Sequence, residues 1–130
     1  MTEQCAIKEM SKGEFMSTEY HITWQDFEKI ALKVGTISKA IPFNEAKKPS
    51  FILSIDLGEK EGIKKSSAQI THHYTCEELI GKQVICVTNF PKKQIGPIMS
   101  EVLVTGFYDE NQNVILAVPD KTILNGAKLA

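Results

Sequence analysis

Apolar and polar residues alternate along several short stretches of this chain, and the alternation predicts β-strands. The clearest stretch is residues 51–57, in which Phe51, Leu53, Ile55 and Leu57 take every second position. A period of two is typical of a strand with one buried and one solvated face. Further β-type runs occupy residues 32–41, 63–70, 83–90, 100–108 and 113–118.

Polar segments that contain glycine or asparagine separate these runs. Residues 58–62 have the sequence Gly-Glu-Lys-Glu-Gly and predict a turn, and residues 109–113 predict a hairpin loop between the last two runs. Gly35 lies inside the first run, where a glycine indicates a bulge or a tight bend.

Two short helices are predicted from their capping residues. Thr23 has the features of an N-cap with Asp26 three residues further on, and Thr75 with Glu78 has the spacing of a capping box, with Gly81 as a stop. In the first helix the apolar residues fall on one face. We expect this face to close the bottom of a barrel or to pack on a partner; its residues are Trp24, Phe27, Ile30 and Ala31.

The order of elements is a short helix, three strands, a second short helix and two or three more strands. Five main strands with a small helix between the third and the fourth is the layout of the oligonucleotide-binding (OB) barrel. We therefore predict an all-β fold, a five-stranded OB-fold barrel with short helices. The pattern leaves an SH3-like barrel and a small sandwich open. Residues 1–22 are polar and aperiodic and predict a flexible N-terminal extension, and residues 23–130 predict one domain.

The charge of the chain argues against avid non-specific binding to nucleic acid. The formal net charge is −1, and all 15 basic residues are lysines. Residues 1–22 carry two lysines and four glutamates, a net charge of −2, so the other 108 residues carry a net charge of +1. An anion-binding surface must then be a local lysine patch. The sequence shows neither an apolar run long enough to span a membrane nor a signal peptide, so we expect a cytoplasmic protein without membrane insertion.

Three stretches could carry binding chemistry. The first, residues 62–70, holds two lysines beside two serines, a combination that suits a phosphate backbone, although a solvated strand end gives the same pattern. The second, residues 87–96, holds Asn89, Phe90 and two lysines. Phe90 is either a platform for an unpaired base or a core residue before a turn. The third, Ser100-Glu101, could place a hydroxyl and a carboxylate at the mouth of a groove.

No catalytic, metal or cofactor site is predicted. His72 and His73 are adjacent and point apart in a strand or a helix, and no second pair of ligands accompanies them. The cysteines Cys5, Cys76 and Cys86 have unrelated spacings and are expected to be reduced thiols. No nucleophile is accompanied by a base and an orienting group at an interpretable spacing, so we predict no enzyme activity.

Five segments of the sequence resemble the CsaA family, in the same order along the chain. They are residues 26–30, 34–37, 63–71, 87–91 and 100–106, and the resemblance extends from about Trp24 to Leu129. The CsaA family is similar to the tRNA-binding domains appended to methionyl- and phenylalanyl-tRNA synthetases. The resemblance therefore implies an OB-fold barrel, a homodimer and tRNA as a partner.

The resemblance also implies a set of RNA-facing residues. We expect them in the third strand, at the end of the fourth and in the fifth: Lys64, Ser66, Ser67, Asn89, Ser100 and Glu101. Lys92 and Lys93 occupy positions where family members tend to have basic residues, often arginine. Lysine keeps the charge there but loses bidentate and stacking contacts. The first helix, with Trp24 and Phe27, is expected at the dimer seam.

We therefore predict structure-selective tRNA binding by a homodimer, without catalysis or a cofactor. CsaA proteins are also described as export-related chaperones. The alternative is thus a molecular chaperone that binds unfolded preproteins and works with export machinery through apolar grooves. The sequence does not choose between the two ligands.

Overall fold

The structure, a computed structural model, describes residues 20–130 and divides the chain into two units, residues 1–30 and residues 31–130. Most of the predicted flexible extension, residues 1–22, and Cys5 lie outside the described residues. The division of the chain at residues 22 and 23 therefore stays a prediction.

The described part of the first unit contains helix α1 (Trp24–Glu28). Thr23 caps it as predicted, because the Asp26 N–H donates to Thr23 Oγ1 at 3.1 Å and the Thr23 N–H donates to Asp26 Oδ2 at 3.2 Å. No residue of α1 is buried.

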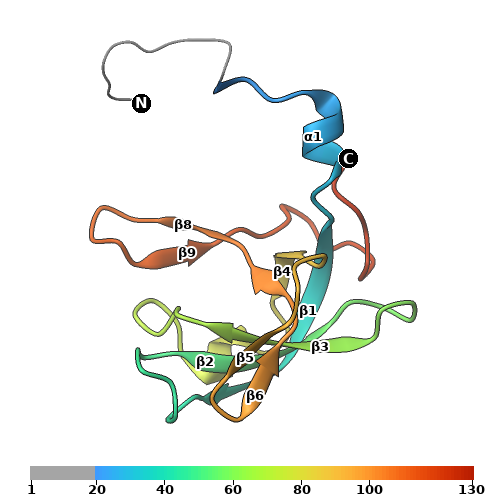
Figure 1. Cartoon of the computed structure of the whole chain (residues 1–130). Coiled ribbons are helices and arrows are strands. Elements are labelled where there is room, and N and C mark those ends of the chain that lie inside the picture. Colours follow the sequence, from blue (N-terminus) through green and yellow to red (C-terminus); the bar gives the residue numbers. More distant parts are fainter. Residues whose placement is uncertain (1–19) are drawn as a thin grey trace, which may run out of the picture. The chain divides into compact units, whose positions relative to one another are not determined.

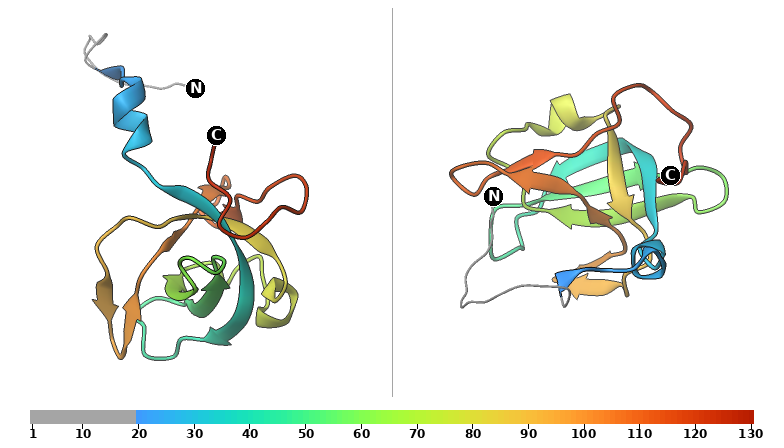
Figure 2. Two further views of the ribbon diagram at one scale, coloured as in Figure 1. Left: turned by 90° about the vertical axis from the view of Figure 1, so that its right-hand side faces the viewer. Right: turned by 90° about the horizontal axis from the view of Figure 1, so that it is seen from above.

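The second unit is a nearly closed five-stranded antiparallel barrel with the strand order β3-β2-β1-β4-β7, which confirms the all-β OB-like fold (Figures 1 and 2). The barrel strands are β1 (Leu32–Pro42), β2 (Phe51–Asp56), β3 (Ile63–Ala68), β4 (Gln83–Val87) and β7 (Leu103–Val104). Two hairpins accompany them, one made of β5 (Lys93–Ile95) and β6 (Ile98–Ser100), the other of β8 (Gly106–Tyr108) and β9 (Val114–Leu116).

The core lies inside the barrel, and the alternation in β2 fills much of it. Leu53, Ile55 and Leu57 are at most 1% exposed, whereas the residues between them are half-buried, as the period of two predicts. Helix α2 (Cys76–Leu79) adds Leu79 to the same core. Its predicted capping box is present, because the Thr75 and Glu78 side chains each accept from the other's backbone N–H.

The region 100–108, predicted as one strand, is divided among three strands. Its first residue ends β6, and β7 and β8 follow. The division has a physical reason, since each piece has a different partner: β6 pairs with β5, β7 with β4, and β8 with β9.

The β8–β9 hairpin is held to the loop after β3 by two side chains. His73 Nε2 lies 2.7 Å from Asp109 Oδ2, and the Leu116 N–H donates to Tyr74 Oη at 2.9 Å. Asp109 also accepts from the N–H groups of Asn111 and Asn113, which confirms the predicted hairpin loop. These contacts lower the pKa of the Asp109 carboxyl, the Asn113 N–H contributing most.

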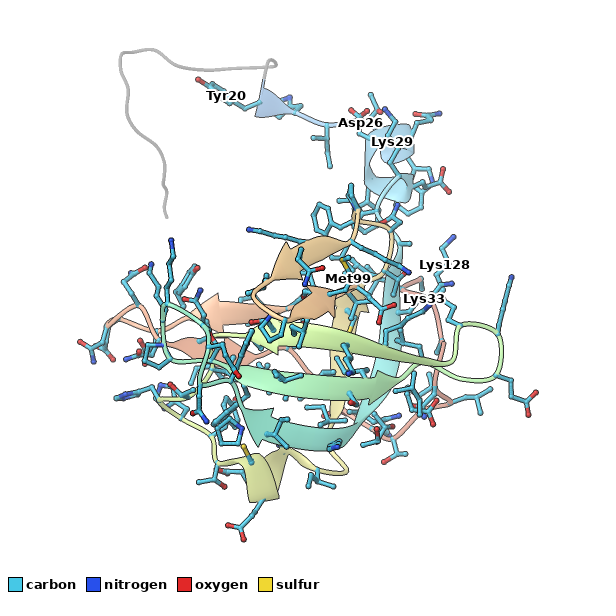
Figure 3. The ribbon with its side chains drawn as sticks, turned by 60° about the horizontal axis from the view of Figure 1, so that its bottom comes forward. Tyr20, Asp26, Lys29, Lys33, Met99 and Lys128 are labelled. Atoms are coloured by element: carbon cyan, nitrogen blue, oxygen red, sulfur yellow. The ribbon has the colours of Figure 1, made fainter. Side chains whose placement is uncertain are left out.

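The C-terminal segment runs beside the start of β1. The Gly126 N–H donates to Val34 O at 2.7 Å and the Leu129 N–H to Leu32 O at 2.9 Å. Lys33 and Lys128 form a β-bridge between these hydrogen bonds, and the two labelled side chains lie close together in Figure 3. Lys33 also forms an ion pair with Glu61 at the turn before β3.

Gly35 is explained by close packing, and the predicted bulge lies elsewhere. The bulge of β1 falls between Ile37 and Lys39, while Gly35 is in regular register with Val84. A Cβ atom at Gly35 would lie 2.5 Å from Cγ2 of Ile55 and 2.8 Å from Cδ2 of Leu57. Glycine therefore leaves room for the Ile55 and Leu57 side chains against the backbone of β1.

We expect Gly35→Ala to destabilise the protein by about 1–3 kcal/mol, because the added methyl group would clash with the side chains of Ile55 and Leu57 and overpack the core. Urea unfolding followed by circular dichroism measures the change. Lys39→Ala is the control, since it alters an exposed position of the same strand. Equal unfolding midpoints for the two variants would contradict the packing argument.

Candidate nucleic-acid interface

A groove of about 540 Å³ lies beside the β5–β6 hairpin. It contains five of the eight residues predicted to face RNA, Ser67, Lys92, Lys93, Ser100 and Glu101, together with Phe90. We call it the lysine groove. The structure thus brings together residues from β3, from the chain after β4 and from the end of β6, which are far apart in the sequence.

The Glu101 carboxylate at this groove contacts two lysine ammonium groups and a backbone N–H. Its Oε1 atom is 3.5 Å from Lys92 Nζ and 4.0 Å from Lys64 Nζ, and its Oε2 atom accepts the Lys65 N–H at 3.0 Å. The Lys65 N–H and the two ammonium groups hold the pKa of the Glu101 carboxyl below its usual range. The carboxylate therefore stays ionised near neutral pH and offsets part of the lysine charge.

Ser100 and Glu101 also serve as a strand partner for the outer edge of β3. The Ser67 N–H donates to Ser100 Oγ at 3.1 Å, and the Glu101 N–H donates to Lys65 O at 2.8 Å. Together with the bond from the Lys65 N–H to Oε2, they satisfy backbone groups that an edge strand leaves open. Both residues thus close the barrel as well as line the groove.

Ser66 is not at the surface, and the prediction that it faces RNA is wrong for this structure. Its side chain is 1% exposed and points into the barrel, where its position is paired with Leu53. Successive residues of a strand point to opposite faces, so Ser66 and Ser67 cannot both reach one ligand. Ser67 is half-buried and lines the groove.

Asn89 and Lys64 are outside the lining of the lysine groove. Asn89 Oδ1 accepts the Ala31 N–H at 3.0 Å, and Thr88 just before it bonds to the Ala31 carbonyl oxygen. The end of β4 is thereby held to the chain entering β1. Lys64 reaches the groove only through its ion pair with Glu101.

Phe90 is exposed rather than buried in the core. It follows the end of β4 and is 56% exposed at the groove, so its ring is available to a ligand. Sequence reasoning missed Leu103, which is 49% exposed and lines the same groove. Its signal is weak, because a leucine in a strand usually indicates a buried position.

Possible metal ligands and two cysteines occur among residues 20–130, the described part of the chain. No group of three or more His, Cys, Asp or Glu side chains is suited to hold a metal ion in this part of the chain. Cys86 is buried, and burial raises the pKa of its thiol to about 12. Cys76 is half-buried and is a free thiol. No described helix is long and apolar enough to cross a membrane.

The predicted dimer residues lie on α1. The rings of Trp24 and Phe27 are in contact, with centroids 5.5 Å apart and planes tilted by 43°. Trp24 is 61% exposed, and no residue of α1 is buried.

The fold and the groove define a small OB-like barrel that presents a lysine-lined surface. A family model described as a putative tRNA binding domain matches residues 32–128, and the chain belongs to this family. The five barrel strands, from Leu32 to Val104, all lie within the matched residues.

Two similar solved structures confirm the resemblance to the CsaA family. The chaperone CsaA of Bacillus anthracis is 42% identical, with a TM-score of 0.79 over 85% of this chain and 99% of that one. The CsaA chaperone protein of Picrophilus torridus is 46% identical, with a TM-score of 0.79 over 85% of this chain and all of that one.

Curated relatives include much longer proteins. The methionine–tRNA ligase of Leptospira biflexa is 37% identical over 110 residues, which are 85% of this chain and 16% of the ligase. The ligase of Pyrococcus horikoshii is 30% identical over 92% of this chain and again 16% of the ligase. The chain thus spans about one sixth of the length of these relatives and is homologous to one part of them.

We expect Glu101→Ala to lower stability at neutral pH by about 1 kcal/mol, because the Lys65 N–H loses its acceptor, and Glu101→Gln to lower it less. A lowered native pKa gives stability that is present above the unfolded pKa and lost as pH falls through the native value. Below about pH 4.3, the usual glutamate pKa, the wild type should therefore lose a contribution that neither variant has.

Urea unfolding at neutral and acid pH measures these differences. Glu110→Ala is the control, since Glu110 is an exposed residue of a hairpin loop. A Glu101→Ala variant as stable as Glu110→Ala at neutral pH would show that the carboxylate does not help to close the barrel.

Proposed function

We propose that this protein binds tRNA through the lysine groove, without catalysing a reaction. Membership of the tRNA-binding family supports the class of ligand. We choose this site because Lys92 and Lys93 line the same groove, of about 540 Å³, as an exposed Phe90. Ammonium groups attract phosphates, and an exposed ring suits an unstacked base.

The lysines of the groove have different tasks in this proposal. Within residues 20–130 Lys93 has no ion-pair partner, so it offers its full charge to a phosphate. Lys92 and Lys64 share the Glu101 carboxylate, which positions them at the groove. Glu101 and Ser100 then act mainly by closing the barrel, and Ser67 offers a hydroxyl to the ligand.

Two symmetric copies would bind tRNA more tightly than one. We infer a homodimer in which α1 packs on a partner through Trp24 and Phe27. The support is the exposed indole on a helix with no buried residue. A closed dimer repeats one groove on each subunit, and two linked sites on one RNA raise the overall affinity.

Binding of unfolded chains is the second candidate function. Its support is that the two similar solved proteins are named chaperones and that the chain exposes large apolar side chains, Leu124 at 83% among them. An unfolded client peptide therefore belongs in every RNA-binding assay as a competitor.

We expect Lys92→Glu combined with Lys93→Glu to weaken tRNA binding and to make its salt dependence shallower. Losing two phosphate contacts reduces the slope of log affinity against log salt by roughly 1.4 to 1.8. Fluorescence anisotropy with labelled tRNA at several salt concentrations measures both quantities.

The matched control is Lys60→Glu combined with Lys121→Glu. Both residues are exposed and lie outside the lysine groove. Each pair takes the formal net charge from −1 to −5, since each substitution changes it by −2. Equal losses in the two pairs would show that net charge matters and the groove does not. Glu101→Gln should instead strengthen tRNA binding, because the neutral amide no longer offsets the positive charges of Lys64 and Lys92.

We also expect Trp24→Ala to weaken the dimer by about 2 kcal/mol or more, roughly a 30-fold rise in its dissociation constant, because a central tryptophan carries much of an interface's free energy. Sedimentation analysis over a range of concentrations measures it. Glu28→Ala on the same helix is the control. A wild type that stays monomeric at all concentrations would exclude the proposed seam.

A further inference from the structure

A second groove of about 480 Å³ adjoins the lysine groove. Ser67 of β3 and Leu103 of β7 line both, so the two grooves meet at these residues, and we refer to them together as the trough. Of the described residues that line the second groove, none is charged. We call it the neutral groove, and Tyr108 of β8 lines it but does not line the lysine groove.

The trough has a cationic end and an aromatic, uncharged end. Phe90 and the lysines occupy the first, and Tyr108, 72% exposed, stands at the second, with Leu103 between them. We propose that this trough binds a run of unpaired nucleotides, with phosphates at Lys92 and Lys93 and bases stacked on Phe90 and Tyr108. The proposal rests on the tRNA-binding function and specifies the part of the RNA that is bound.

Unpaired bases fit the neutral groove better than a duplex does. A duplex presents phosphates and hides the faces of its bases, and an uncharged groove adds no ionic attraction for those phosphates. An unpaired base has a face that stacks on an aromatic ring whatever its sequence. Gln69 lines the neutral groove, and no hydrogen bond uses its side-chain amide within residues 20–130, so the amide is available to a base edge.

The hairpin contacts hold Tyr108 in place. The hydrogen bonds His73–Asp109 and Leu116–Tyr74 hold the β8–β9 hairpin on both sides of its loop. Gly106 lets the two strands approach, because a Cβ there would lie 2.5 Å from Cγ1 of Val114. A ring on such a braced hairpin loses little freedom when a base stacks on it.

An extended peptide would fit the trough less well. Peptides that bind at a sheet edge do so through backbone hydrogen bonds. At the β3 side of the trough the N–H groups of Lys65 and Ser67 already donate to Glu101 and Ser100. Stacking and phosphate contacts need no such ladder, which favours nucleotides.

The test compares a labelled single-stranded RNA with a blunt RNA duplex of equal length as competitors of labelled tRNA, using the full chain. We expect the single strand to compete more strongly. Tyr108→Leu and Phe90→Leu should each weaken single-strand binding about fivefold or more, the loss expected when one stacked base is released. Phe107→Leu is the matched control. Phe107 is 69% exposed, and as the neighbour of Tyr108 in β8 it points to the other face.

A spectroscopic signature makes the test independent of affinity. Trp24 is the single tryptophan, so Tyr108→Trp in a Trp24→Phe background places the only indole in the neutral groove. Single-stranded RNA should quench its fluorescence, and unchanged fluorescence at saturation would overturn the stacking arrangement.

The outcomes separate this proposal from the proposed function. If the Lys92 and Lys93 variant binds tRNA as tightly as the control pair, the lysine groove itself is wrong. If that variant weakens binding but Tyr108→Leu and Phe90→Leu match Phe107→Leu, or if the duplex competes as well as the single strand, only the trough is wrong. Displacement of the single strand by an unfolded peptide that Tyr108→Leu no longer binds would assign the trough to peptides.

Discussion

The barrel depends on how the outer edge of β3 finds hydrogen-bond partners. β3 ends the strand order β3-β2-β1-β4-β7, and an unpaired edge would invite association with another chain. Ser100 and Glu101 supply these partners. Their side chains accept two hydrogen bonds from β3, and the Glu101 N–H donates a third to Lys65 O. Ser100 is the last residue of β6 and Glu101 follows it, so both stand at the end of the β5–β6 hairpin. The opening of the barrel is thereby reduced to a groove.

The same closure decides the electrostatics of the groove. A carboxylate that accepts a backbone N–H is fixed in place, so it also fixes the ammonium groups of Lys64 and Lys92 around it. Its negative charge lowers the attraction for phosphate that the lysines alone would have. If the groove binds phosphate as we propose, one residue thus links the stability of the barrel to the strength of anion binding, and a change at Glu101 alters both.

Much of the fold could be predicted from the sequence, because it is local in origin. The alternation at 51–57 fixes which face of β2 is buried, and the two capping boxes fix where the helices begin. Contacts between distant residues could not be predicted. The division of residues 100–108 depends on three different pairing partners, and Gly35 responds to side chains of another strand.

The candidate site shows the same limit. Lys92, Lys93 and Phe90 are identified by composition and position, and the structure places them in one groove. The prediction that Ser66 faces RNA is wrong because successive polar residues of a strand point to opposite faces, and Ser66 points inward. The task of Glu101 depends on a contact with a residue 36 positions away, which no local pattern signals. Tyr108 and Leu103 become part of a trough only when β7 and β8 are set beside β3.

Because the chain has no arginine, the uncharged part of the trough becomes important for selectivity. Lysine attracts phosphate as a point charge and lacks the planar fork that reads geometry. With 15 lysines and no arginine, the charged end can supply affinity and steering but little selectivity. Selectivity must then come from groups that distinguish RNA by its exposed base faces or its shape. Within residues 20–130, the exposed rings of Phe90 and Tyr108 and the braced hairpin are suited to do so in the proposed complex.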